Sequence, residues 1–478
     1  MSKTIIIIGA GLAGLSAALQ AAENGCNVKL VSSFPSERAQ SVMAEGGINA
    51  ALNTKDENDS PEEHFTDTIK AACGLADPNA VWGMTQAAPE LVHWLLKLGV
   101  KFNMSGYDDV DLRNFGGQKK KRTAFAQSDT GKQIMTAMID AVRRKEASGM
   151  VERFSHHSFL TLRLCGNICC GCVIRDEYSQ ETVELPGDAV IVATGGMHGL
   201  FGNTTGSLSN TGEVTAELFR LGVPLANGEM IQYHPTTVKC GGKRMLISEA
   251  ARGEGGRLFA MKDGKQWYFM EEKYPELGNL MPRDITAREI WKVSHESEVF
   301  LDMTEISEEI ISNKLSGLAD DCMTYLHKDI RKEPVSVLPG IHYFMGGILV
   351  DEQHRTPIQN LYAAGECCAQ YHGANRLGGN SLLGALYGGR VAAKSACEQA
   401  DVVELSCATQ IDVPPASQIS EIKQLNKVMQ ETMGVVRNEN TLLNGIRTVQ
   451  ALTGNLPLLG MAVLKSALAR KESRGAHW

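Results

Sequence analysis

The first part of the chain alternates apolar runs with amphipathic segments. The β-branched run at 4–8 is typical of a parallel strand that is buried on both faces, and 27–31 predicts a second strand. Helical patterns follow at 79–99 and 131–145, whereas the polar, acidic stretch 52–66 predicts a surface loop. This alternation indicates an α/β fold built on a parallel sheet.

A glycine-rich turn separates the first strand from an alanine-rich helix. Gly9, Gly11 and Gly14 have the spacing G-x-G-x-x-G. The first glycine permits a tight turn, the second lets the backbone approach a pyrophosphate, and the third lets helix and strand pack closely. The position between strand and helix favours a dinucleotide site over a plain strand–turn–helix packing unit.

The second strand ends without the acidic residue that a nicotinamide-binding fold places there. Ser32 and Ser33 occupy these positions, which argues against the common NAD fingerprint but not against a dinucleotide. A later apolar strand pattern, 188–192, runs into the sequence A-T-G-G at 193–196. This is a second place where backbone is expected to approach the ligand closely.

The pattern changes twice in the second half of the chain. Charged helical segments and Gly–Pro interruptions over 230–340 predict an inserted domain, after which the first kind of sequence returns at 360–400. We therefore expect an α/β, Rossmann-like binding domain (1–233 and 340–400) interrupted by an inserted domain (234–339). A helical C-terminal domain (401–478) follows, with a linker at 401–418.

Composition narrows the class of protein. The 478 residues carry 47 basic and 55 acidic side chains, giving a net charge of −8, and 119–122 is the longest basic run that we single out. No nucleic-acid partner is expected from this balance. Because no run of eighteen apolar residues appears, we expect no transmembrane segment and a cytoplasmic location, or one peripheral to the inner membrane through a partner.

Four of the twelve cysteines crowd into one segment: Cys165, Cys169, Cys170 and Cys172. The segment alternates like a hairpin around a turn at 166–167, and neighbouring side chains on a strand point to opposite faces. Packed thiols in a reducing compartment are therefore favoured over a metal or iron–sulfur site, and we predict no metal.

These residues together resemble the flavoprotein subunits of fumarate reductase and succinate dehydrogenase, with L-aspartate oxidase as a near relative. The resemblance covers 3–478. It is carried by the ordered motifs AEGGINAAL, FGGQ, ATGG, QYHPT, SEAARGEGG, PRD, HYFMGGI, LYAAGE and NRLGGNSLL.

The resemblance implies FAD bound by the interrupted domain, with the inserted segment 234–339 as an α+β capping domain. Gly9, Gly11 and Gly14 would hold the pyrophosphate, Ser32 the ribose side, and Glu366 and Ser381 the ribityl and flavin region. The full set of expected cofactor residues is Gly9, Ala10, Gly11, Gly14, Ser32, Ser41, Gly46, Gly47, Thr194, Gly195, Glu366, Ser381 and Leu382.

Two positions set the chain apart within the family. Membrane-bound members attach FAD covalently through a histidine, and the matching position here is Gln40. An amide cannot form that bond, so dissociable FAD is predicted. Glu45, where succinate-oxidising members more often have glutamine, and the absence of a covalent bond both favour fumarate reduction.

The resemblance also assigns the chemistry. Arg283 matches the proton donor, and Glu249 and Arg252, spaced i and i+3 on a predicted helix start, match the relay residues. His234 and Ser248 would contact one substrate carboxylate and His342 and Arg376 the other, while Phe115 and Gly116 would wall the site. Reduced flavin supplies the hydride.

Departures and alternatives remain at this stage. Thr211-Gly212-Glu213 replaces a T-G-D near the adenosine half, and longer members continue past S-R-G-A-H (473–477) into a tail, so tail functions such as docking an iron–sulfur subunit are outside the resemblance. Electrons are expected from an external donor, such as an iron–sulfur protein, a small flavin or a quinol-type donor. L-aspartate oxidase, a succinate dehydrogenase flavoprotein subunit and a non-catalytic electron-bridging subunit are the alternatives.

Overall fold

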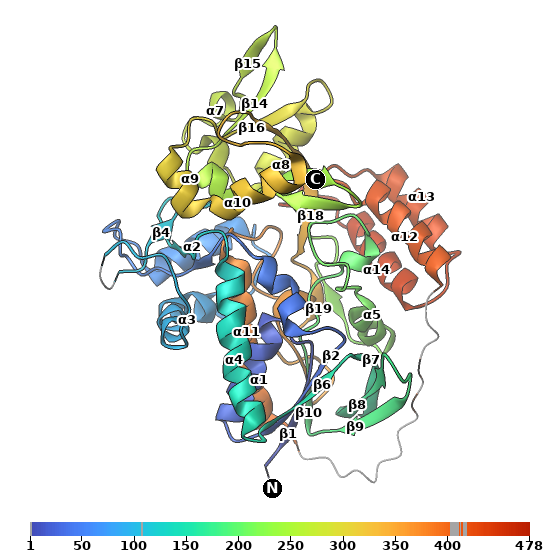
Figure 1. The fold of residues 1–478 in the computed structure, drawn as a ribbon. Coiled ribbons are helices and arrows are strands. Elements are labelled where there is room, and N and C mark those ends of the chain that lie inside the picture. The colour runs from blue at the N-terminus through green and yellow to red at the C-terminus, as the bar shows by residue number, and fades with distance from the viewer. Residues whose placement is uncertain (1, 107–108, 402–410, 412, 414–417) are drawn as a thin grey trace.

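A five-stranded parallel sheet forms the centre of the structure, a computed structural model that describes residues 2–106, 109–401, 411, 413 and 418–478 (Figure 1). Its strand order is β20-β10-β1-β2-β6, and every neighbouring pair is parallel. The strands are β1 (Thr4–Ile8), β2 (Asn27–Ser32), β6 (Val151–Ser155), β10 (Ala189–Val192) and β20 (Leu361–Ala363). The predicted parallel α/β sheet is confirmed.

The apolar run of β1 is buried on both faces, as its composition predicted. Ile5 and Ile7 join the core beneath the helices, whereas Ile6 and Ile8 join the core on the opposite face. This division follows from the two-residue period of a strand, which sends successive side chains to opposite sides.

Helices cover one face of the sheet and a small antiparallel sheet lies on the other. Figure 1 shows the long helices side by side on the helical face. They are α1 (Leu12–Glu23), α3 (Pro78–Lys97), α4 (Thr130–Ala147) and α11 (Asn380–Gln399). The opposite core contains side chains from β7 (His157–Cys165), β8 (Ile168–Asp176), β9 (Thr182–Pro186) and α5 (Glu213–Arg220).

The surface loop expected over 52–66 is wrong in its second half, because α2 (Pro61–Ala71) begins there. Ser60 caps this helix by accepting a hydrogen bond from the backbone N–H of Glu63, and Pro61 occupies the first turn. A capping serine, a proline and acidic residues in the first turn are helix-start signals, and here they outweigh the polar composition.

Residues 231–344 build two further antiparallel sheets around a core of their own. One sheet has the order β13-β12-β18 and the other the order β15-β14-β16-β17. The strands are β12 (Ile231–Cys240), β13 (Lys243–Leu246), β14 (Arg257–Lys262), β15 (Lys265–Trp267), β16 (Val299–Asp302), β17 (Val335–Ser336) and β18 (Leu338–Phe344). The helices are α6 (Glu249–Gly253), α7 (Phe269–Lys273), α8 (Arg283–Val293), α9 (Glu308–Lys314) and α10 (Ser316–Asp321).

The remaining strands are short. They form the sheets β3-β5-β4 and β11-β19-β21. Their bounds are β3 (Ile48–Asn49), β4 (Leu112–Arg113), β5 (Thr123–Ala124), β11 (Leu225–Ala226), β19 (Gly347–Leu349) and β21 (Cys368–Ala369). The other elements among the described residues are short helical turns: η1 (Ser36–Arg38), η2 (Gln40–Met43), η3 (His198–Leu200), η4 (Gly278–Leu280), η5 (Cys322–Leu326) and η6 (Gly365–Cys367).

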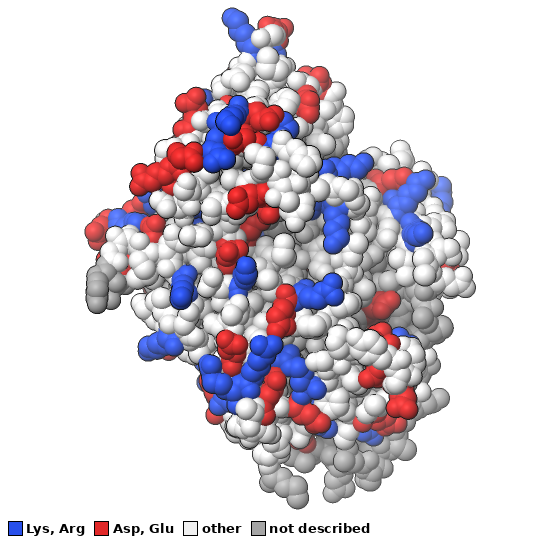
Figure 2. Space-filling model, viewed as in Figure 1, with Lys and Arg blue, Asp and Glu red and all other residues white. Residues whose placement is uncertain are grey.

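Three helices end the chain, as the periodicity of 419–470 predicted: α12 (Ile419–Thr432), α13 (Glu439–Val449) and α14 (Asn455–Ala469). They share a core with the segment around Phe201. The linker predicted at 401–418 lies mostly outside the described residues. Acidic and basic side chains are interspersed over the face shown in Figure 2.

The clustered cysteines lie on the predicted hairpin. Cys169 and Cys172 are buried in the core beneath the sheet, and burial raises the pKa of Cys169 to about 12. The expectation that all four are free thiols is wrong for Cys165, which is disulfide-bonded. In the described part of the chain, no three His, Cys, Asp or Glu side chains are arranged to hold a metal ion, and no helix is long and apolar enough to cross a membrane.

Candidate functional site

A cavity of about 710 Å³ opens at the carboxyl ends of the parallel strands. The residues that follow β1, β2, β10 and β20 line one side, and side chains from 231–344 line the other. Ligands of open α/β sheets bind at this edge, and the volume is that of a large small-molecule site.

The glycine turn after β1 forms the floor of this cavity. Gly9 has φ +108°, and a Cβ placed on it would lie 2.2 Å from the carbonyl oxygen of Ala193. A Cβ on Gly14 would lie 1.8 Å from the carbonyl oxygen of Gly9. Gly11 caps α1, so the free N–H groups of the helix N-terminus face the region predicted to hold the pyrophosphate.

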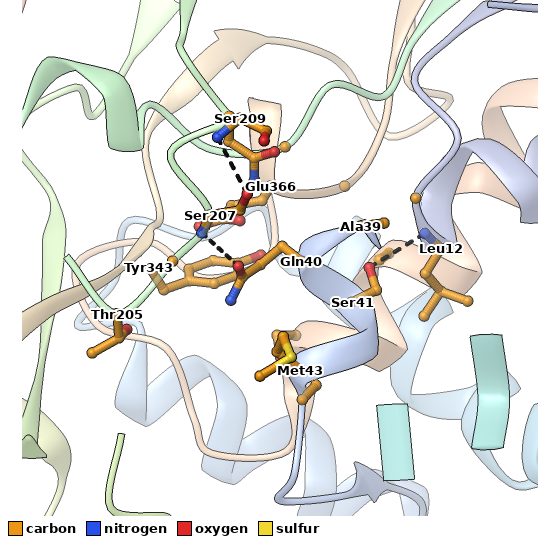
Figure 3. A pocket seen from close by; sticks show the side chains of 18 of the residues that line it. Leu12, Ala39, Gln40, Ser41, Met43, Thr205, Ser207, Ser209, Tyr343 and Glu366 are labelled. Carbon is orange, nitrogen blue, oxygen red and sulfur yellow. Dashed lines mark hydrogen bonds between the residues drawn. The ribbon is translucent and has the colours of Figure 1, made fainter. Parts of the chain in front are cut away.

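Ser41 and Ser32 line the same cavity as this turn. The Oγ atom of Ser41 accepts a hydrogen bond of 3.3 Å from the backbone N–H of Leu12 (Figure 3). Ser32 is 7% exposed, and its Oγ atom has no hydrogen-bond partner among the described residues. A ribose hydroxyl at the predicted position would satisfy this buried oxygen.

The second half of the predicted cofactor site lies around Glu366 and at the start of α11. Glu366 accepts a hydrogen bond of 3.1 Å from the backbone N–H of Phe344, and its Oε1 lies 3.6 Å from Nε2 of His198. Gly379, at φ +85°, turns the chain into α11, whose first residues include Ser381 and Leu382 at the cavity wall.

Gln40 reaches across the cavity toward the segment 205–209 (Figure 3). Its Oε1 atom accepts a hydrogen bond of 2.6 Å from the backbone N–H of Ser207. The amide therefore fixes this loop at the wall where the resemblance places a covalent histidine.

A contiguous chain of ionic contacts connects Arg283, Glu249 and Arg252. Arg283 donates to Oε2 of Glu249 from Nε at 2.9 Å and from Nη2 at 2.6 Å. Arg252 donates from Nη2 to Oε1 of Glu249 at 3.2 Å, and the backbone N–H of Gly116 donates to the same oxygen at 3.1 Å. All three charged side chains are at most 6% exposed.

The positive charges of Arg283 and Arg252 keep Glu249 ionised. Burial raises the pKa of Glu249, but Arg283 and Arg252 more than offset that effect, so the net direction is down. Burial is also the largest cause of the lowered pKa of Arg252. An ionised carboxylate between two guanidinium groups can accept a proton from either side, which a proton relay requires.

Two histidines and a second arginine complete the polar wall. The rings of His234 and His342 lie 5.1 Å apart, and Nδ1 of His342 lies 2.7 Å from the hydroxyl of Thr205. Burial and Arg283 lower the pKa of both histidines well below its ordinary value, so both rings are neutral. Burial and Arg283 also lower the pKa of Arg376, to about 9.

Arg376 lies against an aromatic ring and has free hydrogen-bonding capacity. Its guanidinium carbon is 4.3 Å from the ring centroid of Tyr343. Its Nε atom is buried and has no hydrogen-bond partner in the described part of the chain. Together with Arg283, Arg376 gives the cavity two guanidinium groups, the chemistry suited to binding carboxylates.

Glu45 faces the cavity between the sheet and the 231–344 region. Burial, then Asp321 and Asp129, raises its pKa from the ordinary value of 4.5 to about 8. Glu45 is therefore largely protonated near neutral pH.

Most residues singled out from the sequence line this one cavity. The three that do not are Gly14, Gly116 and Arg252. Gly14 lies behind the turn, where it packs α1 against β1, and Gly116 and Arg252 lie behind Glu249. Phe115 lines the cavity and would lie 2.7 Å from a Cβ on Gly46.

Sequence reasoning missed several polar contacts. Gln232 accepts a hydrogen bond of 3.1 Å from Nη1 of Arg283 and donates to the carbonyl oxygen of Arg376 at 2.8 Å, so it joins both arginines. Its place in the quoted motif QYHPT was a usable signal. Thr205 and Ser207 lie in a segment without any motif, and no pattern pointed to them.

The residues present fit FAD. The glycine turn has no side chains that would keep a phosphate from its backbone. Ser32 has a buried hydroxyl oxygen without a hydrogen-bond partner among the described residues. The cavity continues without interruption from this end to the histidine–arginine wall.

Comparisons with known proteins agree with this geometry. A family model described as an FAD binding domain matches residues 4–382. The succinate dehydrogenase flavoprotein subunit of Bacillus subtilis is 44% identical over 413 residues, covering 84% of this chain and 70% of that protein. An L-aspartate oxidase of Caulobacter vibrioides is 35% identical over 486 residues, covering 99% of this chain and 92% of its own.

A solved structure extends the similarity to the fold. The FrdA chain of E. coli quinol fumarate reductase, in a mutant form, superimposes with a TM-score of 0.89 at 27% identity. The match covers 100% of this chain and 91% of that chain.

Proposed function

The chain belongs to the family of FAD-binding flavoproteins that includes the flavoprotein subunits of succinate dehydrogenase and fumarate reductase, and we propose that it reduces fumarate, or a close unsaturated dicarboxylate, to the saturated acid. This reaction places the protein among the oxidoreductases that act on CH–CH bonds. The observation that carries the proposal is the buried contact chain Arg283–Glu249–Arg252 at the cavity wall.

Arg283 is proposed as the proton donor to the substrate carbon. FAD, when bound, supplies the hydride. A guanidinium is a poor acid alone, but Arg283 donates two hydrogen bonds directly to Glu249, which can return a proton to it. Arg252 extends this relay, and the positive charge of Arg283 stabilises the carbanion-like transition state.

The substrate carboxylates are proposed to bind at the two ends of the polar wall. Arg376 and His342 would hold one, and His234 and Ser248 the other. Since both histidines are neutral, they would act as hydrogen-bond donors, and the arginines would supply the charge. Phe115 would close the side of this pocket, whereas Gly116, expected to wall the site with it, lies behind Glu249 and holds that carboxylate through its backbone N–H.

FAD is proposed to bind without a covalent bond, because Gln40 stands where the resemblance expects the attaching histidine.

We also propose a division into domains: residues 1–233 and 340–400 would form the FAD domain, 234–339 the capping domain and 401–478 the helical domain. Support comes from the origin of the wall residues, since Ser248 and Arg283 come from the proposed cap whereas Arg376 comes from the FAD domain.

Electrons are proposed to come from an external donor, which an iron–sulfur subunit or a small reduced carrier could provide. A cytoplasmic location, free or peripheral to a membrane through a partner, accompanies this proposal.

Anaerobic assays with a reduced viologen dye test the function. We expect fumarate to yield succinate, and Arg283→Ala to abolish turnover while leaving the flavin absorption spectrum unchanged. Unimpaired turnover in that variant would overturn the proposed relay.

Two further assays separate the alternatives. The 44% identity to a succinate dehydrogenase subunit favours that protein's activity as the second candidate. Succinate oxidation that exceeds fumarate reduction would establish that direction. Peroxide formation from aspartate and oxygen, without fumarate reduction, would identify an L-aspartate oxidase.

A further inference from the structure

Two cysteines far apart in sequence meet at the end of the cofactor domain remote from the cavity. Sγ of Cys26 lies 3.0 Å from Sγ of Cys397. Both are free thiols, and neither belongs to the crowded segment that the sequence singled out. We propose that Cys26 and Cys397 form a reversible disulfide when the protein meets a peroxide.

The surroundings of the pair hold the two sulfurs together. Cys26 follows the turn that ends α1, and its backbone N–H donates to the carbonyl oxygen of Ala21 at 3.0 Å. Cys397 lies in the last turn of α11, where Nζ of Lys3 donates to its carbonyl oxygen at 2.7 Å. Each cysteine is therefore held at its own helix end, and Cys397 is also held by the side chain of Lys3.

The helices that carry the pair are packed tightly along their length. The hydroxyl of Ser16 donates to the carbonyl oxygen of Leu386 at 2.7 Å, and a Cβ on Gly389 would lie 2.3 Å from the carbonyl oxygen of Ala13. Because α1 and α11 cannot slide without breaking these contacts, the sulfur–sulfur approach is a stable feature of the fold.

Access and protonation determine which thiol reacts first and how fast. Cys26 is 5% exposed, whereas Cys397 is partly exposed and can meet a small oxidant. Burial raises the pKa of the Cys397 thiol to about 12, so this thiol stays protonated at neutral pH and reacts slowly.

The oxidation balances with hydrogen peroxide alone. The sulfur of Cys397 attacks one peroxide oxygen, the O–O bond breaks, and a sulfenic acid and one water form. The sulfur of Cys26 then displaces the hydroxyl group as a second water, and the S–S bond forms. Two thiols are oxidised and one peroxide is reduced, and a thiol reductant reverses the step by exchange.

The bond would tie the first helix of the domain to its last. Both helices begin at the cavity, α1 after Gly11 and α11 after Gly379. Cross-linking residues so distant in sequence restricts the unfolded chain, so we expect oxidation to raise Tm by about 2–5 °C.

Peptide mapping of the FAD-loaded protein after hydrogen peroxide treatment tests the proposal. We expect a cross-linked peptide containing Cys26 and Cys397 that disappears on reduction. Cys73→Ser, which removes an exposed thiol elsewhere, should keep the cross-link, whereas Cys397→Ser should lose it.

The Cys26→Ala/Cys397→Ala variant provides the control for stability. It should melt like the reduced wild-type protein and show no Tm change with peroxide. Separate sulfinic acids at the two positions without a cross-linked peptide would overturn the proposal, as would an unchanged peroxide-induced Tm rise in the double variant.

Discussion

At the scale of single residues, Glu249 connects Arg283 at the cavity wall with Arg252 behind it. Its two oxygens accept hydrogen bonds from these two guanidinium groups and from the backbone N–H of Gly116. An uncharged side chain of the same shape would leave two buried arginines without their counter-charge.

We expect Glu249→Gln to lower kcat by about 100-fold, because an amide cannot return a proton to Arg283. KM for fumarate should change by less than about threefold, since the proposed carboxylate contacts remain. Steady-state kinetics with a reduced viologen dye measure both. Glu271→Gln is the matched control, because Glu271 pairs with Arg257 away from the cavity. A loss of the same size in both variants would contradict the relay.

Glu45 gives stability a dependence on pH. Its pKa is raised to about 8 in the folded protein, so the folded state holds a proton that the unfolded state loses above pH 4.5. This contribution to stability therefore falls as pH rises from 4.5 to about 8.

We expect the Glu45→Gln variant not to show this loss of stability at high pH, because glutamine does not ionise. The free energy of unfolding of the variant minus that of wild type should increase by about 2–3 kcal/mol between about pH 5.5 and about pH 9. Denaturant unfolding of the FAD-loaded protein at both pH values measures the difference. An advantage that is equal at the two pH values would show that Glu45 ionises normally.

Sequence reasoning succeeded at residues that stand in motifs. Arg283 and Glu249 lie in contact, as the relay hypothesis requires, although their roles stay predictions. Thr205 and Ser207 were missed because a backbone or hydroxyl contact with His342 or Gln40 leaves no trace in local sequence. Such contacts arise only from tertiary packing.

At the scale of elements, the turn between β1 and α1 decides the shape of the cavity floor. Gly14 belongs to α1, and a Cβ on it would lie 1.8 Å from the carbonyl oxygen of Gly9, the residue that follows β1, so only a glycine lets the helix pass this close to the turn. This close approach brings the N-terminus of α1 to the cavity.

We expect Gly14→Ala to destabilise the protein by about 1–3 kcal/mol and to weaken FAD binding, because the added methyl group forces α1 off the strand. Gly242→Ala is the control, since a Cβ there meets nothing within 4 Å, and it should change stability by less than about 0.5 kcal/mol. Thermal unfolding and FAD titration measure the two effects. Equal behaviour of the variants would contradict the packing role.

Elements with a strong apolar period were predicted well, whereas a polar helix with a weak period was missed. The run 4–8 and the helix at 79–99 show the burial that their patterns require. The helix α2 was missed because it has too few apolar residues to show a helical period, although Ser60 and Pro61 are typical helix-start residues. In polar stretches, capping residues are therefore as informative as periodicity.

At the scale of the whole molecule, the cavity joins segments from the first turn to the start of α11. Sequence order could not predict the strand order β20-β10-β1-β2-β6, because pairing of β20 with β10 joins strands that are distant in the chain. The family resemblance implied a binding domain built from two separate parts of the chain, but it was not used to predict a strand order.

We expect acid precipitation to release all FAD from the protein, because Gln40 cannot form a covalent bond with it. The precipitated protein should show no flavin fluorescence, and the supernatant should contain free FAD. Retained fluorescence in the washed protein would show covalent attachment through another residue.

Removal of FAD should also lower Tm, because the cofactor binds only the folded state. At a free FAD concentration of about 100 times Kd the stabilisation is about 2.7 kcal/mol. Thermal unfolding with and without added FAD measures it, and restoration by FAD serves as the control. A Tm that does not respond to FAD would contradict binding at this cavity.

The edge position of β20 has a consequence for biosynthesis. β10 keeps one unpaired edge until residues 361–363 are made, and Ser381 completes the cavity wall only after that. A nascent chain that emerges from its N-terminus therefore carries the glycine turn long before the remaining walls exist. Cofactor loading must wait until most of the chain has been translated, and the open edge of β10 needs protection from aggregation in the meantime.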